Sequence, residues 1–308
     1  MLKSPAQNNN LLRLEEVKKY FPVKGGGLLK AVDGVSFSVG DAEVFGLVGE
    51  SGCGKSTLAR LILKLIEPTA GTIFFDNIDL VRAKAEVLFN LRKRLQIIFQ
   101  DPYASLNPRK RVIDAVGEAL IIHKIAKWKE IRDKVIELLQ RVGLGADALY
   151  KYPHEFSGGQ RQRVCIARAL AVSPKLIVAD EPLSALDVSI QAQIINLLED
   201  LQRESALSFV FISHNLKVIE HFSHRVAVMY LGRIVELAKT EDIFAEPFHP
   251  YTEALLSAVP EIEPEKKTKR IILEGDVPSP VIIPPGCPFH PRCPKRFGPC
   301  NTEFPAFH

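Results

Sequence analysis

A short apolar run, a glycine-rich loop and the start of a helix follow one another in Val44-Phe-Gly-Leu-Val-Gly-Glu-Ser-Gly-Cys-Gly-Lys-Ser-Thr57. The apolar run predicts a buried strand that ends at Val48. After the loop, apolar residues recur at helical spacing as far as Ile66, just before Pro68, and predict a helix. This order of strand, loop and helix is the context in which the pattern G-x-x-x-x-G-K-[ST] binds the phosphates of a nucleotide.

The loop supplies the groups that a polyphosphate needs. Its glycines let backbone N–H groups close around phosphate oxygens, and the following helix directs its positive N-terminal end at them. Lys55 adds a cation, and the hydroxyl of Ser56 is a ligand for Mg²⁺. Cys53 is expected to fill space rather than to take part in redox chemistry. We expect the whole loop to contact the nucleotide: Gly49, Glu50, Ser51, Gly52, Cys53, Gly54, Lys55, Ser56 and Thr57.

Length and composition are typical of a globular protein. The 308 residues allow one large domain and a small appendage. The composition, with 46% hydrophobic and 25% charged residues, excludes a disordered or collagen-like chain. A net charge of +4 is too small to indicate a nucleic-acid partner. The densest apolar runs, such as residues 226–231, are strand-sized, and the polar N-terminus lacks the apolar core of a signal peptide. We therefore expect a chain that does not span a membrane and stays in the cytoplasm.

Strand patterns alternate with helix patterns along the chain, which favours an α/β fold with a mixed, mainly parallel central sheet. Residues 12–39 contain short β-prone runs and predict an antiparallel N-terminal flap. Buried strands are expected at 176–179, 209–212 and 226–229, and amphipathic helices at 131–142, 164–171 and 190–201. Prolines and cysteines become frequent after about residue 240, where we place a domain boundary.

An acidic pair closes one of these strands, in Leu176-Ile-Val-Ala-Asp-Glu-Pro182. In phosphate-loop enzymes, an aspartate at this place supports Mg²⁺ and a neighbouring carboxylate faces the attacking water. We therefore expect Asp180 to serve the metal ion and Glu181 to act as general base. Without the phosphate loop upstream, the same pair would more often be a solvated strand end.

Phe156-Ser-Gly-Gly-Gln-Arg-Gln-Arg163 resembles the signature segment of ATP-binding-cassette (ABC) ATPases. In that family two subunits meet head to tail, and each ATP lies between the phosphate loop of one subunit and the signature of the other. The resemblance therefore implies ATP as ligand and a second ABC ATPase as partner, either a copy of this chain or a paralogue. The signature residues implied to contact the partner's ATP are Ser157, Gly158, Gly159 and Gln160.

Other motifs of the family follow in order. Gln100 resembles the glutamine that touches Mg²⁺ and the attacking water, and His214 resembles the switch histidine that contacts the γ-phosphate. The stretch Ser184-Ala-Leu-Asp187, which ends in Asp187, resembles the loop that crosses the dimer interface. Phe21 matches the aromatic residue that stacks on adenine, with Tyr20 as the alternative. The implied catalytic set is Glu181, His214, Gln100 and Lys55, and the implied Mg²⁺ set is Ser56, Gln100 and Asp180.

Three further stretches resemble the ATPase subunits of bacterial oligopeptide and dipeptide importers, more like the second of their two paralogous ATPases. They are Gln100-Asp-Pro-Tyr-Ala-Ser-Leu-Asn-Pro108, Glu181-Pro-Leu-Ser-Ala-Leu-Asp-Val-Ser-Ile-Gln-Ala-Gln193 and Ala245-Glu-Pro-Phe-His-Pro-Tyr-Thr252. This resemblance implies an ATPase on the cytoplasmic face of the membrane, two transmembrane permease subunits and an extracytoplasmic substrate-binding protein.

The same resemblance implies an ABC nucleotide-binding domain over residues 1–240, with a helical subdomain at about 103–172, and a C-terminal extension over 241–308. Nickel or another small solute is an alternative substrate. A soluble ABC ATPase of translation or DNA repair is an alternative function. That function fits less well, since such proteins carry two cassettes or long coiled coils, and we expect no nucleic-acid partner.

Three cysteines lie close together in the tail, in Gly286-Cys-Pro-Phe-His-Pro-Arg-Cys-Pro294 and at Cys300. The thiolates of Cys287, Cys293 and Cys300 suit a soft metal, and some importer ATPases carry a four-iron four-sulfur cluster on four cysteines. A fourth ligand would be His290, His308, a residue that follows His308, or an exogenous group. Zinc and uncomplexed thiols are the alternatives.

Overall fold

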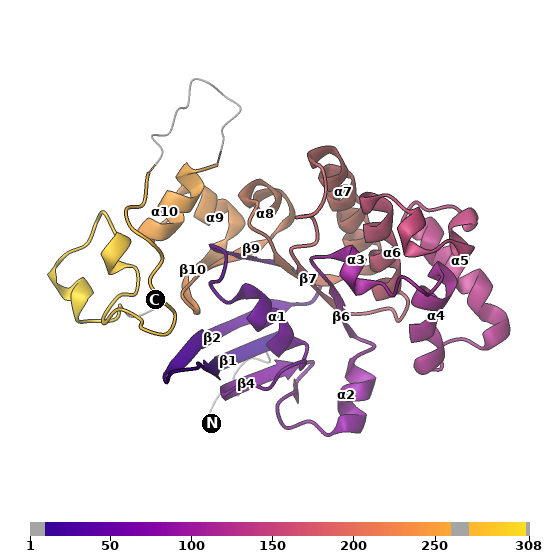
Figure 1. Cartoon of the computed structure of the whole chain (residues 1–308), viewed down its shortest axis with the longest axis horizontal. Coiled ribbons are helices and arrows are strands. Elements are labelled where there is room, and N and C mark those ends of the chain that lie inside the picture. Colours follow the sequence, from indigo (N-terminus) through magenta and orange to yellow (C-terminus); the bar gives the residue numbers. More distant parts are fainter. Residues whose placement is uncertain (1–9, 260–270, 306–308) are drawn as a thin grey trace, which may run out of the picture.

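The computed structural model describes residues 10–259 and 271–305, which form two sheets surrounded by helices (Figure 1). The strands are β1 (Asn10–Pro22), β2 (Leu28–Gly40), β3 (Val44–Val48), β4 (Ala70–Phe75), β5 (Ile78–Asp79), β6 (Leu95–Ile98), β7 (Leu176–Asp180), β8 (Ser208–Ile212), β9 (Arg225–Tyr230) and β10 (Arg233–Lys239). The helices are α1 (Lys55–Ile62), α2 (Ala85–Leu91), α3 (Pro102–Ser105), α4 (Val112–Ile122), α5 (Ile131–Arg141), α6 (Gly158–Leu170), α7 (Val188–Ser205), α8 (Leu216–Phe222), α9 (Thr240–Ala245) and α10 (Pro250–Ser257).

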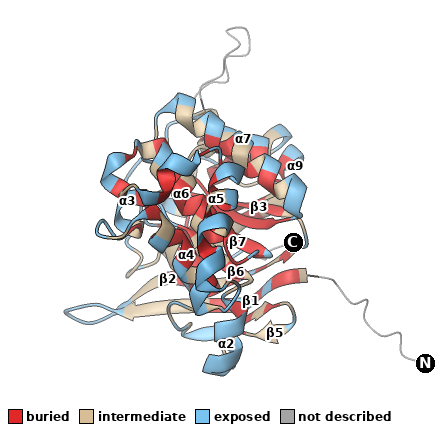
Figure 2. Ribbon diagram, turned by 90° about the vertical axis from the view of Figure 1, so that its right-hand side faces the viewer, coloured by how far each residue is buried: buried red, intermediate tan, exposed pale blue. Residues whose placement is uncertain are grey.

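The larger sheet has six strands in the order β10-β9-β3-β8-β7-β6. All neighbouring pairs are parallel except β10, which runs antiparallel to β9. The central strands β3, β7 and β8 consist entirely of buried residues (Figure 2), as expected for a sheet covered on two sides. In β3, Phe45 and Leu47 pack toward the N-terminal sheet, whereas Val44 and Val48 pack with the helices of the opposite layer. This confirms the predicted mixed, mainly parallel sheet.

The N-terminal flap is a four-stranded sheet in the order β2-β1-β4-β5, and its strand pairs are antiparallel. Helix α1 contributes Leu58, Leu61 and Ile62 to the core that this sheet shares with the larger one. The predicted antiparallel flap is therefore confirmed, and it holds α1 against the central sheet.

Helix α1 is shorter than the apolar spacing predicts, because it ends at Ile62 rather than near Ile66. Lys64 adopts a left-handed backbone with φ of 52°, and the N–H of Leu65 donates to the carbonyl of Arg60 at 2.9 Å. This hydrogen bond closes the helix end in the manner that a glycine usually provides. The side chain of Leu65 consequently lies 53% exposed instead of in the core.

Helices α3 to α6 lie together at one end of the molecule, and the segment that follows α10 lies at the other (Figure 1). This segment, residues 271–305, contacts β2 through a hydrogen bond from the N–H of Lys30 to the carbonyl of Pro280 at 3.1 Å. Within the described residues, no helix combines the length and apolar character needed to cross a bilayer.

Candidate nucleotide site

The phosphate loop connects β3 to α1, and two of its glycines are required by close packing. A Cβ on Gly49 would lie 2.2 Å from the carbonyl oxygen of Met229, and one on Gly54 would lie 2.0 Å from that of Ala31. Both glycines have positive φ, 152° and 111°. The spacing of the motif therefore reflects the contacts of the loop with β2 and β9 as well as its phosphate chemistry.

Lys55, the first residue of α1, is buried in the loop that precedes it. Its Nζ donates to the carbonyl of Gly49 at 2.7 Å and to that of Glu50 at 2.9 Å. Cys53 is also buried, and burial raises the pKa of its thiol. A protonated buried thiol agrees with the expected space-filling role, and the ammonium of Lys55 is placed where phosphate oxygens would enter the loop.

Ser56 and Asp180 bring a hydroxyl and a carboxylate together. The Oγ of Ser56 donates to Oδ1 of Asp180 at 3.0 Å, because the first turn of α1 lies beside the end of β7. Burial raises the pKa of the Asp180 carboxyl, and the charge of Glu181 adds to this effect, while the hydrogen bond from Ser56 opposes it. Two hard oxygen donors beside a phosphate loop fit Mg²⁺, which binds through few protein ligands together with substrate phosphates.

Gln100, Glu181 and His214 meet although they follow three different strands. The Nε2 of Gln100 donates to Oε2 of Glu181 at 3.1 Å, and Nδ1 of His214 lies 3.2 Å from the same oxygen. They follow β6, β7 and β8, which are neighbours in the parallel sheet. Since ligands of such sheets bind at the carboxyl ends of the strands, the structure brings the predicted catalytic side chains to the expected edge.

The backbone of Glu181 is held by the neighbouring strand. Its φ of 47° lies in the left-handed region, as it does at Lys64 and several other non-glycine residues of the described chain. A hydrogen bond from its N–H to the carbonyl of Ile212, the last residue of β8, at 3.0 Å holds it there. This contact continues the pairing of β7 with β8 and places Glu181 at the carboxyl ends of these strands.

The signature segment forms the N-terminus of α6. Oγ of Ser157 accepts from the N–H of Gln160 at 3.3 Å, and the N–H of Ser157 donates to Oε1 of Gln160 at 3.1 Å, so the two residues form a capping box. A Cβ on Gly159 would lie 2.6 Å from Cγ2 of Ile190 on α7, the helix that Asp187 precedes. Ser157 and Gln160 are exposed, which leaves this helix start open to a partner.

Tyr20 and Phe21 have different surroundings on β1. The hydroxyl of Tyr20 donates to Oδ1 of Asp33, and burial together with that carboxylate raises the pKa of Tyr20 to about 12. The ring of Phe21 lies beneath Nζ of Lys19, which is 5.0 Å from its centroid. Tyr20 is thus engaged in a hydrogen bond with Asp33, and Phe21 stays the predicted adenine-stacking residue.

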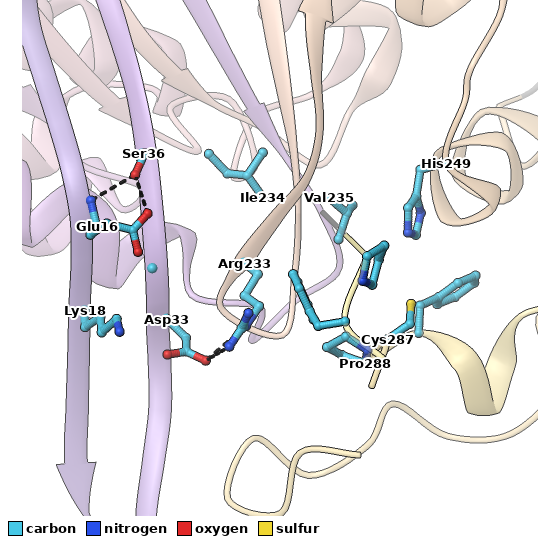
Figure 3. A pocket seen from close by; sticks show the side chains of 14 residues that line it. Glu16, Lys18, Asp33, Ser36, Arg233, Ile234, Val235, His249, Cys287 and Pro288 are labelled. Carbon is cyan, nitrogen blue, oxygen red and sulfur yellow. Dashed lines mark hydrogen bonds and ion pairs between the residues drawn. The ribbon is translucent and has the colours of Figure 1, made fainter. Parts of the chain in front are cut away.

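The three tail cysteines lie in one segment, in which no preformed set of metal ligands is found among the described residues. The N–H of Cys287 donates to the carbonyl of Cys300 at 2.9 Å, and Cys287 lines a cavity of about 490 Å³ beside Arg233 and His249 (Figure 3). In residues 10–259 and 271–305, no group of three or more His, Cys, Asp or Glu is arranged to hold a metal ion. The iron–sulfur cluster therefore stays a prediction. His290 directs Nδ1 at the carbonyl of Cys287, at 2.9 Å, and His308 lies outside the described residues.

Sequence reasoning missed two residues that contact the phosphate loop from the C-terminal extension. The hydroxyl of Tyr251 accepts from the N–H of Glu50 at 2.9 Å, and the guanidinium of Arg292 donates to both carboxylate oxygens of Glu50 at 2.9 and 3.2 Å. These pairs are 201 and 242 residues apart in sequence. No local pattern signals contacts over such separations.

Comparison with known proteins agrees with this geometry. The family model described as "ABC transporter" matches residues 32–184, and the model described as "Oligopeptide/dipeptide transporter, C-terminal region" matches residues 235–300. The oligopeptide transport ATP-binding protein AppF of Bacillus subtilis is 50% identical, over 98% of this chain and 94% of that protein. The dipeptide transport ATP-binding protein DppF of Haemophilus influenzae is 49% identical, over 97% of this chain and 93% of that protein.

Solved structures show the same cassette fold. The dimeric ATP-binding cassette MJ0796, in a post-hydrolysis state bound to ADP and Pi, superposes with a TM-score of 0.68 and 30% sequence identity. The match covers 74% of this chain and 98% of that cassette. The family and the fold predicted from the sequence are confirmed. The chain thus belongs to the ABC transporter family, among the ATP-binding proteins of oligopeptide and dipeptide transporters.

Proposed function

We propose that this chain hydrolyses ATP to drive the import of dipeptides or oligopeptides through partner membrane permeases. The observation that carries the proposal is the meeting of Gln100, Glu181 and His214 beside the Ser56–Asp180 pair. A water-activating carboxylate, a polarising histidine and a metal-binding pair are the parts that phosphoryl transfer to water requires. The family of the chain supports the peptide substrate.

The residues act as follows in the proposed reaction. Lys55 and the loop N–H groups hold the β- and γ-phosphates of ATP. Ser56, Asp180 and Gln100 would hold Mg²⁺, which would supply positive charge to the phosphate oxygens. Glu181 accepts a proton from the attacking water, and His214 and Gln100 orient that carboxylate and the water in line with the γ-phosphorus. Phe21 stacks on adenine.

A complete site requires a second ATPase subunit. The start of α6, with Ser157, Gly158, Gly159 and Gln160, directs the positive end of that helix at the γ-phosphate of ATP bound to that subunit. Asp187, at the start of α7, takes part in the same interface. The relatives AppF and DppF support a place as the second of two paralogous ATPases in one importer.

The remaining assignments rest on the family. We place the chain on the cytoplasmic face of the membrane, bound to two permease subunits that receive peptides from an extracytoplasmic binding protein. Residues 1–240 form the nucleotide-binding domain in this proposal, with the helical subdomain at about 103–172, and 241–308 form the extension.

The test of the proposal is to trap the complex and identify its components. A tagged Glu181→Gln variant is incubated with ATP in membranes of the native host, extracted gently and analysed by mass spectrometry, with Lys55→Ala as the control that does not bind ATP. Two different multi-span permeases and a second ATPase, recovered only with Glu181→Gln, are the expected result. Ribosomal or DNA-repair proteins without a permease would contradict it. Uptake assays with the purified complex test which substrate is transported. We expect uptake of a labelled dipeptide but not of nickel.

A further inference from the structure

The C-terminal extension holds Glu50 of the phosphate loop by its side chain. Both terminal nitrogens of Arg292 donate to the carboxylate of Glu50, at 2.9 and 3.2 Å, in a two-pronged pair. The side chain of Arg292 is only 8% exposed and that of Glu50 is 28% exposed. Charged pairs with this geometry and burial are strong and directional, unlike ion pairs on an open surface.

The same extension also holds the backbone of Glu50. Its N–H donates to the hydroxyl of Tyr251 at 2.9 Å. Tyr251 is fully buried and packs against Phe289 and Tyr230, with ring centroids at 5.4 and 4.7 Å. Phe289 in turn precedes the short 3-10 helix His290–Arg292, so one aromatic cluster fixes both groups that contact Glu50.

The charge of Glu50 makes this contact relevant to nucleotide binding. A carboxylate in a loop that receives the phosphates of ATP repels them, and this repulsion is strong where water is partly excluded. The guanidinium of Arg292 compensates that charge and keeps the carboxylate directed at the extension. Loss of Arg292 alone would leave the negative charge of Glu50 uncompensated beside the phosphates.

We propose that Arg292 is a positioning residue for ATP binding: it neutralises and holds Glu50, and so makes the ATP affinity of the phosphate loop depend on the C-terminal extension. The proposal rests on the assignment of residues 49–57 as the ATP phosphate site. It gives the extension a part in the nucleotide cycle that does not require a metal at the cysteines.

The test compares ATP dissociation constants and steady-state kinetics of the full-length chain and its variants. Arg292→Met is expected to raise the Kd for Mg-ATP about tenfold and to raise KM equally, with kcat at saturating ATP within about twofold of wild type. Arg292→Lys keeps the charge and is expected to restore most of the affinity. Glu50→Gln is expected to leave the Kd unchanged or lower it, because it removes the repelling charge.

The double variant Glu50→Gln/Arg292→Met distinguishes two roles of Arg292. In the first, charge compensation, Arg292 neutralises Glu50; in the second, a structural tie, it only anchors the loop to the extension. Charge compensation predicts a Kd close to wild type for the double variant, whereas a structural tie predicts a Kd raised in Glu50→Gln and in the double variant as well. An unchanged Kd in Arg292→Met would overturn the proposal. If Arg292→Met does not fold, a raised Kd in Glu50→Gln would overturn it instead.

Two controls complete the design. Lys295 lies three residues after Arg292 and forms an exposed ion pair with Glu253 of α10. Lys295→Met removes that pair and is expected to leave the Kd within about twofold of wild type. Lys55→Ala tests the underlying site. ATP binding that survives Lys55→Ala would refute the phosphate-site assignment, whereas loss of binding in Lys55→Ala with a normal Kd in Arg292→Met would refute only the role of the extension.

Discussion

Oε2 of Glu181 lies 3.2 Å from Nδ1 of His214, although 33 residues separate the two in sequence. They meet because Glu181 is the first residue after β7 and His214 the second after β8, and these two strands are adjacent and parallel. In the tautomer that carries the proton on Nδ1, His214 donates to this carboxylate oxygen, and the contact then fixes the orientation of the ring. The proposed base and the proposed switch histidine therefore act as one unit.

Replacement of this histidine is expected to slow hydrolysis without loss of ATP binding. In His214→Ala, kcat should fall about 100-fold, because Glu181 and the water lose an orienting partner, while the Kd for ATP stays within about threefold. His221→Ala is a matched control, since His221 is equally exposed and also pairs with a glutamate, Glu199, at 3.1 Å. Steady-state ATPase assays of both variants check this. Equal losses in the two would contradict a specific role for His214.

Asp180 is expected to cost stability at neutral pH. Its folded-state pKa is raised, first by burial and then by the charge of Glu181. The native state therefore binds this proton more tightly than the unfolded state, and stability contributed by the group falls as the pH rises through the raised pKa. Asp180→Asn should raise the Tm of the nucleotide-free protein at pH 7, and the gain should shrink toward about pH 4, where the unfolded carboxyl is also protonated.

The same variant should lose function while it gains stability. Without the carboxylate the Mg²⁺ site is incomplete, so ATP turnover should fall at least about 100-fold. Thermal denaturation between pH 4 and 8 and an ATPase assay measure the two effects. A Tm that falls at pH 7 would show that the ionised carboxylate stabilises the fold, which contradicts the burial argument.

The two aromatic residues of β1 should respond differently to substitution. Phe21→Ala is expected to weaken ATP binding about tenfold, since stacking of a base on an aromatic ring contributes about 1–3 kcal/mol. Tyr20→Phe should instead lower the free energy of unfolding by about 1 kcal/mol through loss of the hydrogen bond to Asp33. Titration with ATP and chemical denaturation separate the two effects. If Tyr20→Ala weakened ATP binding and Phe21→Ala did not, Tyr20 would be the stacking residue.

Ser157 offers a test of the composite site. Aspartate is a good N-cap, so Ser157→Asp should keep the start of α6 and the stability of the fold, but it places a negative charge against the phosphates of the partner's ATP. ATPase activity of the assembled transporter should fall at least about 100-fold, while ATP still binds to the variant chain itself. Ser157→Ala, which loses the cap but adds no charge, should reduce stability by about 1 kcal/mol and activity much less. Full activity of Ser157→Asp would contradict a partner nucleotide at this helix.

Local patterns in the sequence predicted the parts of the site, and sheet topology explains why those parts meet. The loop before Lys55 and the acidic residues at the end of β7 follow directly from strand, turn and helix periodicity. Their meeting with Gln100 and His214 was expected only from the family resemblance, because parallel neighbours in a sheet are far apart in sequence. The early end of α1 at Ile62 escaped prediction, since the left-handed residue there is Lys64 rather than a glycine.

The contacts of the extension could not be predicted for a related reason. Arg292 lies in a proline-rich segment with no periodicity, and its partner Glu50 is 242 residues away. Arginine and glutamate usually lie at the surface, so an ion pair between two of them far apart in the sequence leaves no recognisable pattern near either residue. The metal site suggested by the spacing of the clustered cysteines stays a prediction, since Cys287 lies beside a cavity and no set of three ligands is arranged for a metal among the described residues.

Hydrolysis by the Glu181→Gln variant tests the central claim most directly. Glutamine keeps the size of the side chain and a donor or acceptor for Gln100 and His214, but it cannot take a proton from water. With the purified chain and its partner, the Kd for Mg-ATP should stay within about threefold of wild type. Single-turnover hydrolysis should slow by about 100-fold to 10000-fold. Hydrolysis at the wild-type rate with normal ATP binding would contradict the role of Glu181 as general base and the catalytic site built around it.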